Sequence, residues 1–116
     1  MQHQVLKRGT EILVPTVLVA DTATERMRGL LSHAGLPPDQ AMFLAPCSSI
    51  HTFFMRFTID VVFVSTELAV TRIVAGVTPF RVVFGGVGAW GGLEFAAGCL
   101  PGGRLEPGDQ LTLSDS

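Results

Sequence analysis

Residues 50–65, which read IHTFFMRFTIDVVFVS, set the fold class of this chain. The stretch holds two short apolar runs, Ile50–Phe57 and Val61–Ser65. Both runs are rich in aromatic and β-branched side chains, which suit a pleated, half-buried surface. Short apolar runs separated by turn residues predict antiparallel strands rather than alternating strands and helices.

The same pattern continues on both sides of this stretch. Glu11–Ala20 is expected to form an early strand, in which Pro15 favours an edge position or a bulge because proline cannot donate to a strand ladder. Glu106-Pro107-Gly108-Asp109 has proline and glycine where a type II turn requires them. Further strands are expected over residues 42–44, 69–77, 81–84, 93–96 and 110–113.

One short helix is predicted over about residues 22–34. Thr22 and Glu25 stand at capping-box spacing, in which each side chain accepts from the backbone amide of the other residue. Apolar residues then recur at the helical period, and Gly35 followed by Pro37 ends the run.

The composition predicts one soluble domain over residues 1–116. Hydrophobic residues make up 47% of the chain and charged residues 16%, so there is enough apolar material for a core. At 116 residues the chain is too short for two such cores. We expect a mainly β fold (α+β by strict count) of seven or eight short, mostly antiparallel strands. A small closed or partly open β-barrel with the one helix would bury them best, and a two-layer α+β sheet is the alternative.

Charge and hydropathy exclude several kinds of partner. The net charge is −2 and the eight basic residues are scattered, so no stripe could neutralise a run of phosphates, and nucleic acid is not expected. No secretory leader and no membrane-spanning run is evident, so we expect a cytoplasmic protein without a membrane span. We expect a monomer or small homo-oligomer.

The two cysteines predict neither a metal site nor a redox motif. Cys47 and Cys99 stand far apart and outside any C-x-x-C pattern, so we expect two reduced thiols in the cytosol, and a disulfide only if the chain is exported. Cys47 and His51 could form a nucleophile and a base, but their spacing is not diagnostic. A zinc site built from Cys47, His51 and Cys99 has no recognised spacing. No metal and no cofactor are therefore expected.

The aromatic stretch holds the candidate binding residues. On a strand, His51, Phe53 and Met55 would share one face and Arg56 would lie on the other. An apolar face with a histidine at its end suits a pocket with a polar mouth, but it equally suits a core strand that ends at the surface. We favour the core interpretation.

Two acidic residues stand within apolar runs, Asp60 and Glu94. A buried carboxylate needs hydrogen-bond partners, which Arg56 or the backbone amides of a neighbouring turn could supply for Asp60. We favour a structural carboxylate that ties down a loop. Asp60 and Glu94 could act as an acid–base pair only if the fold brings them together.

The run Gly86–Gly91 matches the G-x-G-x-x-G pattern of dinucleotide-binding loops. That pattern requires a helix to open at the loop, whereas here glycines and Pro101 follow closely. We therefore predict a glycine-rich hairpin or loop that carries Trp90, the single tryptophan, at or near the surface, either as a ligand contact or as a lid on the core.

Five separated blocks resemble the widespread prokaryotic family of unknown function called DUF192. The blocks cover nearly the whole chain and are RGLL (28–31), AMFL (41–44), TFFMRFTIDVVF (52–63), LE (93–94) with Gly98, and PGD (107–109). The resemblance implies a small, mainly β single domain and supplies no reaction. Met55, Asp60, Glu94 and Gly98 match its motif positions, and relatives usually carry proline where this chain has Thr58. Many relatives appear to be exported.

These observations favour a small non-catalytic accessory domain that binds an unknown small molecule or protein and is not an enzyme. Its candidate binding residues are Phe53, Met55, Arg56 and Trp90. One alternative is an uncharacterised enzyme that uses Asp60 and His51 with Glu94 or Cys47. A second alternative is a structural component of a larger assembly.

Overall fold

The computed structural model describes residues 2–20, 37–53, 55–101 and 105–115. Within these ranges the chain is mainly β and contains no helix. The helix predicted over residues 22–34 lies outside the described residues. The strands are β1 (Gln2–Arg8), β2 (Glu11–Ala20), β3 (Gln40–Leu44), β4 (Ser49–His51), β5 (Ile59–Val64), β6 (Val70–Val77), β7 (Val82–Phe84), β8 (Gly91–Ala96) and β9 (Thr112–Asp115).

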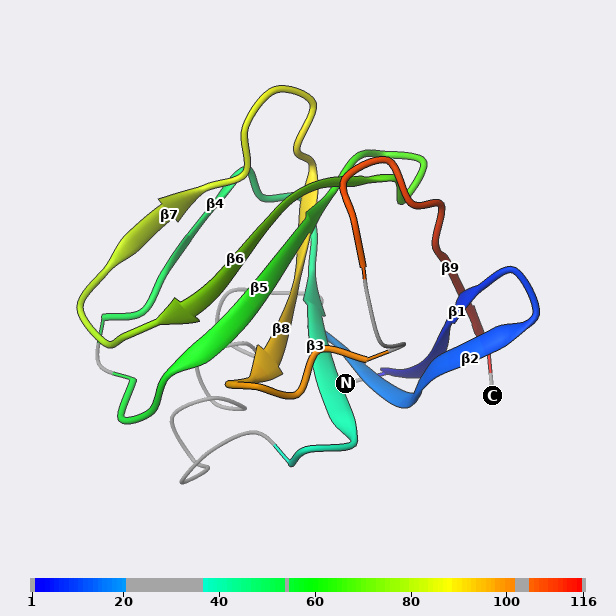
Figure 1. Cartoon of the computed structure of the whole chain (residues 1–116), viewed down its shortest axis with the longest axis horizontal. Helices are drawn as coiled ribbons and strands as arrows, with labels where there is room; N and C mark the ends of the chain where they lie inside the picture. Colours follow the sequence, from blue (N-terminus) through cyan, green and yellow to red (C-terminus); the bar gives the residue numbers. More distant parts are fainter. Residues whose placement is uncertain (1, 21–36, 54, 102–104, 116) are drawn as a thin grey trace.

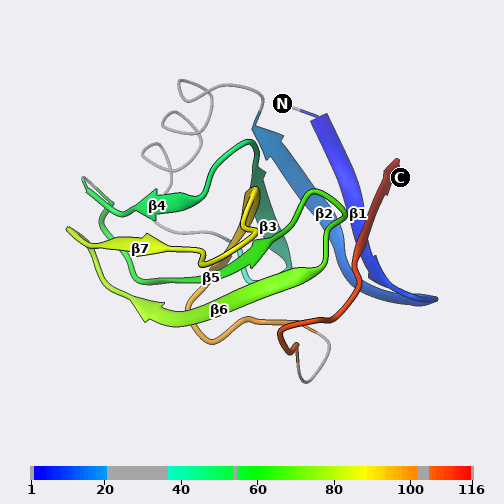
Figure 2. The ribbon, with the colours of Figure 1, turned by 90° about the horizontal axis from the view of Figure 1, so that it is seen from above.

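Seven of these strands form one strongly curved sheet in the order β6-β5-β8-β3-β2-β1-β9, and β4 with β7 forms a second, two-stranded sheet (Figure 1). Parallel pairing joins β2 to β3, and the other neighbours pair antiparallel. Seen from above, β4 and β7 lie beside β5 and β6, whereas β1 and β9 lie at the opposite end of the molecule (Figure 2). The prediction of mostly antiparallel strands is confirmed.

The described strands do not close into a barrel, because β6 and β9 remain the two edges of the large sheet. An isolated bridge joins Ala69, just before β6, to Gln110, in the segment before β9. The start of β6 meets the turn before β9 rather than a strand, since Val70 N donates to Asp109 O at 2.9 Å and Gly108 N donates to Val70 O at 2.7 Å. The expected closed or partly open barrel is therefore not confirmed in this part of the chain, which forms an open seven-stranded sheet and a two-stranded sheet.

Two strand predictions need correction. The run Ile50–Phe57 is not one strand, since β4 ends at His51 and the chain then turns, with Met55 N donating to Thr52 O at 3.2 Å. The first strand, β1, was not predicted because polar residues dominate it. Its hairpin with β2 closes at Gly9, whose φ of 62° favours glycine.

Other local predictions are confirmed. Glu11–Ala20 is the strand β2, and Pro15 sits at a bulge, because Gln4 pairs with Val17 while Leu6 pairs with Val14. The strand is internal rather than at an edge. The turn at 106–109 forms as expected, with Asp109 N donating to Glu106 O at 3.0 Å and Gly108 at a φ of 96°.

The central strands β5 and β8 bury side chains on both faces of the large sheet. Side chains that pair across antiparallel strands share a face, so Val62 and Leu93 point to one side and Phe63 to the other. We call the first cluster the β1–β2 core, because it includes Leu6, Leu13, Val14 and Val17. We call the second the β4–β7 core, because Ile50 and Met55 join it and Val83 packs against it.

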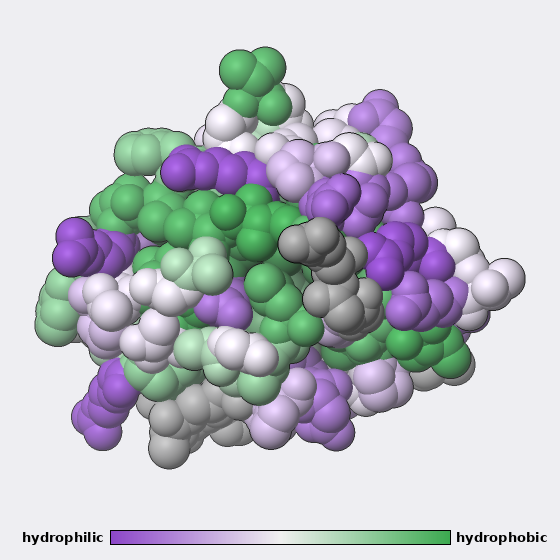
Figure 3. All heavy atoms as spheres, in the orientation of Figure 1, coloured by the Kyte–Doolittle hydropathy of each residue, from purple (hydrophilic) through white to green (hydrophobic). Residues whose placement is uncertain are grey.

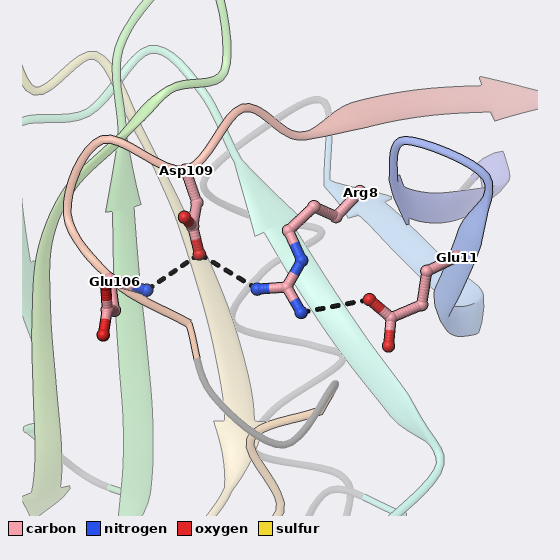
Figure 4. Close-up of polar contacts among 4 residues, drawn as sticks. All are labelled: Arg8, Glu11, Glu106 and Asp109. Atoms are coloured by element: carbon pink, nitrogen blue, oxygen red, sulfur yellow. Dashed lines mark hydrogen bonds and ion pairs between the residues drawn. The ribbon is translucent and has the colours of Figure 1, made fainter.

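A polar contact fastens the β1–β2 hairpin to the turn before β9 (Figure 4). Arg8 Nη1 donates to Asp109 Oδ2 at 3.0 Å, and its Nη2 donates to Glu11 Oε1 at 3.0 Å. The Glu106 amide also donates to Asp109 Oδ2, at 2.9 Å. The hydrogen bond from the Glu106 amide, followed by that from Arg8, lowers the pKa of Asp109.

Candidate functional site

Exposed aromatic side chains gather on the outer side of the β4–β7 sheet. Phe80, Phe84, Val82 and Phe53 are 68%, 63%, 45% and 41% exposed. Val82 pairs with His51 across the two strands, whereas Val83 pairs with buried Ile50 and therefore points to the core. The surface formed by His51, Phe53, Phe80, Val82 and Phe84 is called the aromatic face below.

Ring contacts join three residues of this face. The rings of His51 and Phe53 stack with centroids 5.4 Å apart, and those of Phe53 and Phe80 are tilted at 6.4 Å. Figure 3 shows hydrophobic residues gathered over the region where Figure 1 draws β6 and β7, whereas hydrophilic residues predominate toward β1 and β9, with a smaller hydrophobic area near β2. Among the described residues, the large exposed hydrophobic side chains lie between Phe53 and Trp90, with the exception of Ile12.

A groove of 360 Å³ runs between β6 and β7 and opens to solvent beside the aromatic face. The turn 78–81 closes one of its ends. At the other end β6 is tied to the end of β7, since Arg72 Nη1 donates to Phe84 O at 2.6 Å and Thr71 Oγ1 donates to Gly85 O at 3.2 Å. The two strands are therefore held together at both ends and stand apart between them. The groove is lined by Val74, Ala75, Gly76, Val77, Thr78, Arg81, Val82 and Val83.

Thr52 holds the turn that closes the groove. Its side chain is fully buried, and its Oγ1 donates to Thr78 O at 2.7 Å and accepts from Arg81 N at 2.9 Å. Its backbone N–H donates to Arg81 O at 2.8 Å, and its carbonyl accepts from Phe80 N at 3.1 Å. Sequence reasoning missed Thr52, because threonine in a strand usually lies on a solvated face and only the fold brings residue 78 to it.

Phe80 adopts a backbone conformation that is costly for a bulky residue. Its φ is 64°, in the left-handed region that favours glycine. Leu68 has a similar φ of 66°, but its side chain packs against the β1–β2 core and so recovers part of the cost. Phe80 remains 68% exposed and recovers little by burial.

Two basic side chains lie beside the aromatic face, Arg72 through its bond to Phe84 O and Arg81 in the groove lining. Arg56, Arg72 and Arg81 are all exposed, and Arg81 lines the groove. Within the described ranges both ion pairs are made by Arg8 at the other end of the molecule, so no described carboxylate pairs with these three arginines. The aromatic face therefore carries positive charge on a chain whose net charge is −2.

Asp60 is a buried carboxylate that organises the backbone. It is 3% exposed, and its Oδ1 accepts from Gly76 N at 2.8 Å while its Oδ2 accepts from Gly98 N at 2.9 Å. Both glycines have a positive φ, of 68° and 79° respectively. These contacts are the backbone amides anticipated from the sequence, in place of Arg56, and they give Asp60 a structural task.

The predicted carboxylate pair is not brought together. Asp60 pairs with Phe95 and so points toward the β1–β2 core. Glu94 pairs with Val61 on one side and Met42 on the other, so it points toward the β4–β7 core, where it is fully buried. Because the two carboxylates face opposite sides of one sheet, they do not share a pocket in this arrangement.

The remaining candidates also lie apart. Met55 is buried in the β4–β7 core while Phe53 is exposed, because the chain turns between them instead of continuing as a strand. Cys47 lies beside the start of β8 and Cys99 follows its end, and neither forms a disulfide. The Cys47 Sγ donates to Leu44 O at 3.5 Å. None of the four candidate catalytic residues lines the β6–β7 groove.

Trp90 lies in the glycine-containing loop before β8 and is 36% exposed. Its N–H donates to Val64 O at 2.8 Å, and its carbonyl accepts from Cys47 N at 2.6 Å. Its ring meets Phe43 at a centroid distance of 6.3 Å. No helix follows within the described residues, since β8 begins at Gly91, which agrees with rejecting a dinucleotide-binding loop.

No group of three or more His, Cys, Asp or Glu residues in the described ranges could hold a metal ion. No helix formed by the described residues has the length and apolarity needed to cross a membrane.

Comparison with known proteins supports the family suggested by the sequence blocks. The family model DUF192, described as "Uncharacterized ACR", matches residues 4–113. The chain belongs to the DUF192 family. No curated protein matches this DUF192 chain.

Two solved structures share the fold of this DUF192 domain. A protein of unknown function from Novosphingobium aromaticivorans has a TM-score of 0.76 at 19% identity, with 95% of this chain and 83% of that chain covered. A Sinorhizobium meliloti protein named "a putative transcription regulator" has a TM-score of 0.75 at 20% identity, with 97% and 92% covered. At these identities the likeness establishes the fold of the DUF192 domain and no activity.

Proposed function

We propose that this DUF192 domain is a non-catalytic binding domain that contacts a partner protein through the aromatic face. The observation that carries the proposal is Phe80, which is 68% exposed at a φ of 64°. A left-handed conformation costs a non-glycine residue roughly 1–2 kcal/mol, and exposure leaves the ring without a compensating gain from burial. An exposed aromatic residue kept at such a cost supports a role in contact with another molecule.

The neighbours of Phe80 support the same role. Residues enriched in interface hot spots are aromatic residues and arginine, and they cluster beside pockets. The aromatic face combines Phe53, Phe80 and Phe84 with Arg81 at the adjoining groove. Scattered single hydrophobic residues are normal on a surface, whereas exposed aromatic residues grouped on one side of the molecule support an interaction site there.

Site-specific photo-crosslinking in the source cells tests this function. A photoreactive phenylalanine analogue at position 84 should give a discrete adduct, whereas the same analogue at Ile12, which is exposed on β2 at the other end, should give none. The adduct is identified by mass spectrometry, and binding is then measured with both purified proteins. Phe84→Ser should weaken this binding at least about tenfold without loss of stability.

The outcome at the two positions decides the proposal. Adducts of equal yield at 84 and 12, or purified partners whose affinity is unaffected by Phe84→Ser, would show that the aromatic face is not the binding surface. Thermal unfolding of each variant separates a lost contact from a lost fold.

A further inference from the structure

We infer that the partner segment recognised by the aromatic face is acidic and apolar, with carboxylate side chains placed beside aliphatic or aromatic ones. This inference rests on the proposed binding function and adds the chemistry of the partner. It starts from the charge of the face. Arg56, Arg72 and Arg81 are exposed, and within the described ranges no carboxylate forms an ion pair with them.

Arg81 has the geometry to hold a carboxylate at the mouth of the groove. Its Nε donates to Thr78 Oγ1 at 3.4 Å, and its backbone is fixed on both sides by Thr52. An arginine carries five N–H donors in a planar fork, so the Thr78 contact uses one of them. The end of the fork matches the two oxygens of a carboxylate.

The groove itself has room for a side chain next to that carboxylate, and its lining combines polar surface with apolar side chains. Valines from both strands line it, together with Ala75 and Gly76. Its volume of 360 Å³ is at the low end of the range of small ligand sites, about 300–1,000 Å³. A molecule that filled the groove alone would leave Phe80 and Phe84 in water. A protein segment that covers both the groove and the rings buries them together.

The positions of the acidic residues indicate the sign of the charge on the partner segment. Exposed described carboxylates include Glu11 on β2 and Asp115 on β9, and Figure 2 shows β1, β2 and β9 away from β4 and β7. Two others are Glu106, in the turn before β9, and Asp39, before β3. Glu67 lies in the turn between β5 and β6. Among the described charges placed at the aromatic face, a basic segment would meet Arg72 and Arg81, which carry like charge, and an acidic one would meet opposite charge.

An array of short peptides with random sequences, probed with the purified full chain, tests the assignment. Peptides that bind should be enriched in Asp or Glu next to Leu, Ile or Phe, and their binding should weaken as sodium chloride is raised. The best peptide is then synthesised, with a matched version in which Asn and Gln replace its acids. The Asn/Gln version should bind at least about tenfold more weakly.

Variants of the chain assign the contact to named residues. Arg81→Gln should weaken binding of the acidic peptide about tenfold, and Arg81→Lys should restore only part of it, because the fork is lost while the charge remains. Lys7→Gln, on β1, removes a positive charge elsewhere and should leave affinity unchanged. Anisotropy of a labelled peptide gives the affinities, and thermal unfolding verifies that each variant is folded.

The outcomes separate the two levels of the proposal. Peptides that lose binding on Phe84→Ser but show no acidic enrichment overturn the acidic assignment and leave the binding function standing. Peptides whose binding is insensitive to Phe84→Ser overturn both. Binding to anionic phospholipid vesicles or self-association in sedimentation, with no peptide bound, would overturn the assignment to a partner segment.

Discussion

The Gly98 amide donates a hydrogen bond of 2.9 Å to Asp60 Oδ2, across 38 residues of chain. The second carboxylate oxygen of Asp60 accepts from Gly76 N, so one buried side chain ties β6 and the segment after β8 to β5. Asp60→Ala should lower the free energy of unfolding by about 3 kcal/mol, because hydrogen bonds to a charged group are worth roughly 1.5–3 kcal/mol each. Urea unfolding measures the change.

Asp39→Ala is the matched control for Asp60, since Asp39 is exposed before β3. It should change stability by less than about 0.5 kcal/mol. An equal loss in both variants would contradict the structural role of Asp60.

Thr52→Val should cost about 2 kcal/mol while preserving the shape of the side chain. The hydroxyl donates to Thr78 O and accepts from Arg81 N, and valine can make neither of these part-buried hydrogen bonds. We also expect weaker binding of any ligand of the groove, since the turn 78–81 loses its anchor. Thr16→Val, on β2, is the control, and a milder effect of Thr52→Val than of Thr16→Val would argue against the anchor.

Phe80→Gly should leave stability unchanged or raise it by up to about 1 kcal/mol, because glycine relieves the positive φ. The same change should weaken binding at the aromatic face. Leu68→Gly relieves a similar φ but removes a side chain packed on the β1–β2 core, so it should destabilise the fold. Thermal unfolding and peptide binding, measured together, give the comparison, and a marked loss of stability in Phe80→Gly would refute the cost assigned to this residue.

Gly85→Ala should destabilise the protein by about 2 kcal/mol through overpacking. A Cβ at this position would come within 2.5 Å of Ala89 Cβ and 2.6 Å of the ring of Phe63, which is fully buried. Gly86→Ala meets open space and should cost about 1 kcal/mol through its φ of 82°. If urea unfolding showed a larger loss of stability for Gly86→Ala than for Gly85→Ala, it would contradict the close packing around Gly85.

The pH dependence of stability should report the contact between Arg8 and Asp109. The Glu106 amide, and after it Arg8, lowers the pKa of Asp109 from its ordinary value of 3.8 in the folded chain. A lowered folded pKa stabilises the fold above the unfolded pKa, and this contribution is lost as pH falls through the folded value. Asp109→Asn should therefore destabilise the protein at neutral pH, and its difference from the unmodified chain should shrink below about pH 4.

Thermal unfolding across this pH range checks the effect, with Asp39→Asn as the control. If the difference in stability between Asp109→Asn and the unmodified chain increased as the pH fell, it would contradict a lowered pKa of Asp109. Raising the salt concentration should also narrow the gap at neutral pH, because the contact with Arg8 is partly exposed.

Local chemistry made several elements predictable. The strand β2, the bulge at Pro15 and the turn at 106–109 follow from side-chain type and spacing over a few residues. The backbone-amide partners of Asp60 were predicted as a class, because a buried carboxylate must be satisfied. The strand β1 was missed because pairing with β2 and β9, not its own composition, makes it a strand.

What the sequence determined by itself was therefore the mainly β class, most strand positions, the need of Asp60 for backbone partners and the family. The tertiary structure alone decided which side chains meet. Asp60 and Glu94 lie on opposite faces of one sheet, because the pairing register determines the face on which each side chain lies. The tertiary structure also brought Thr52 to the turn 78–81, and so assembled the aromatic face and its groove from segments that are distant along the chain.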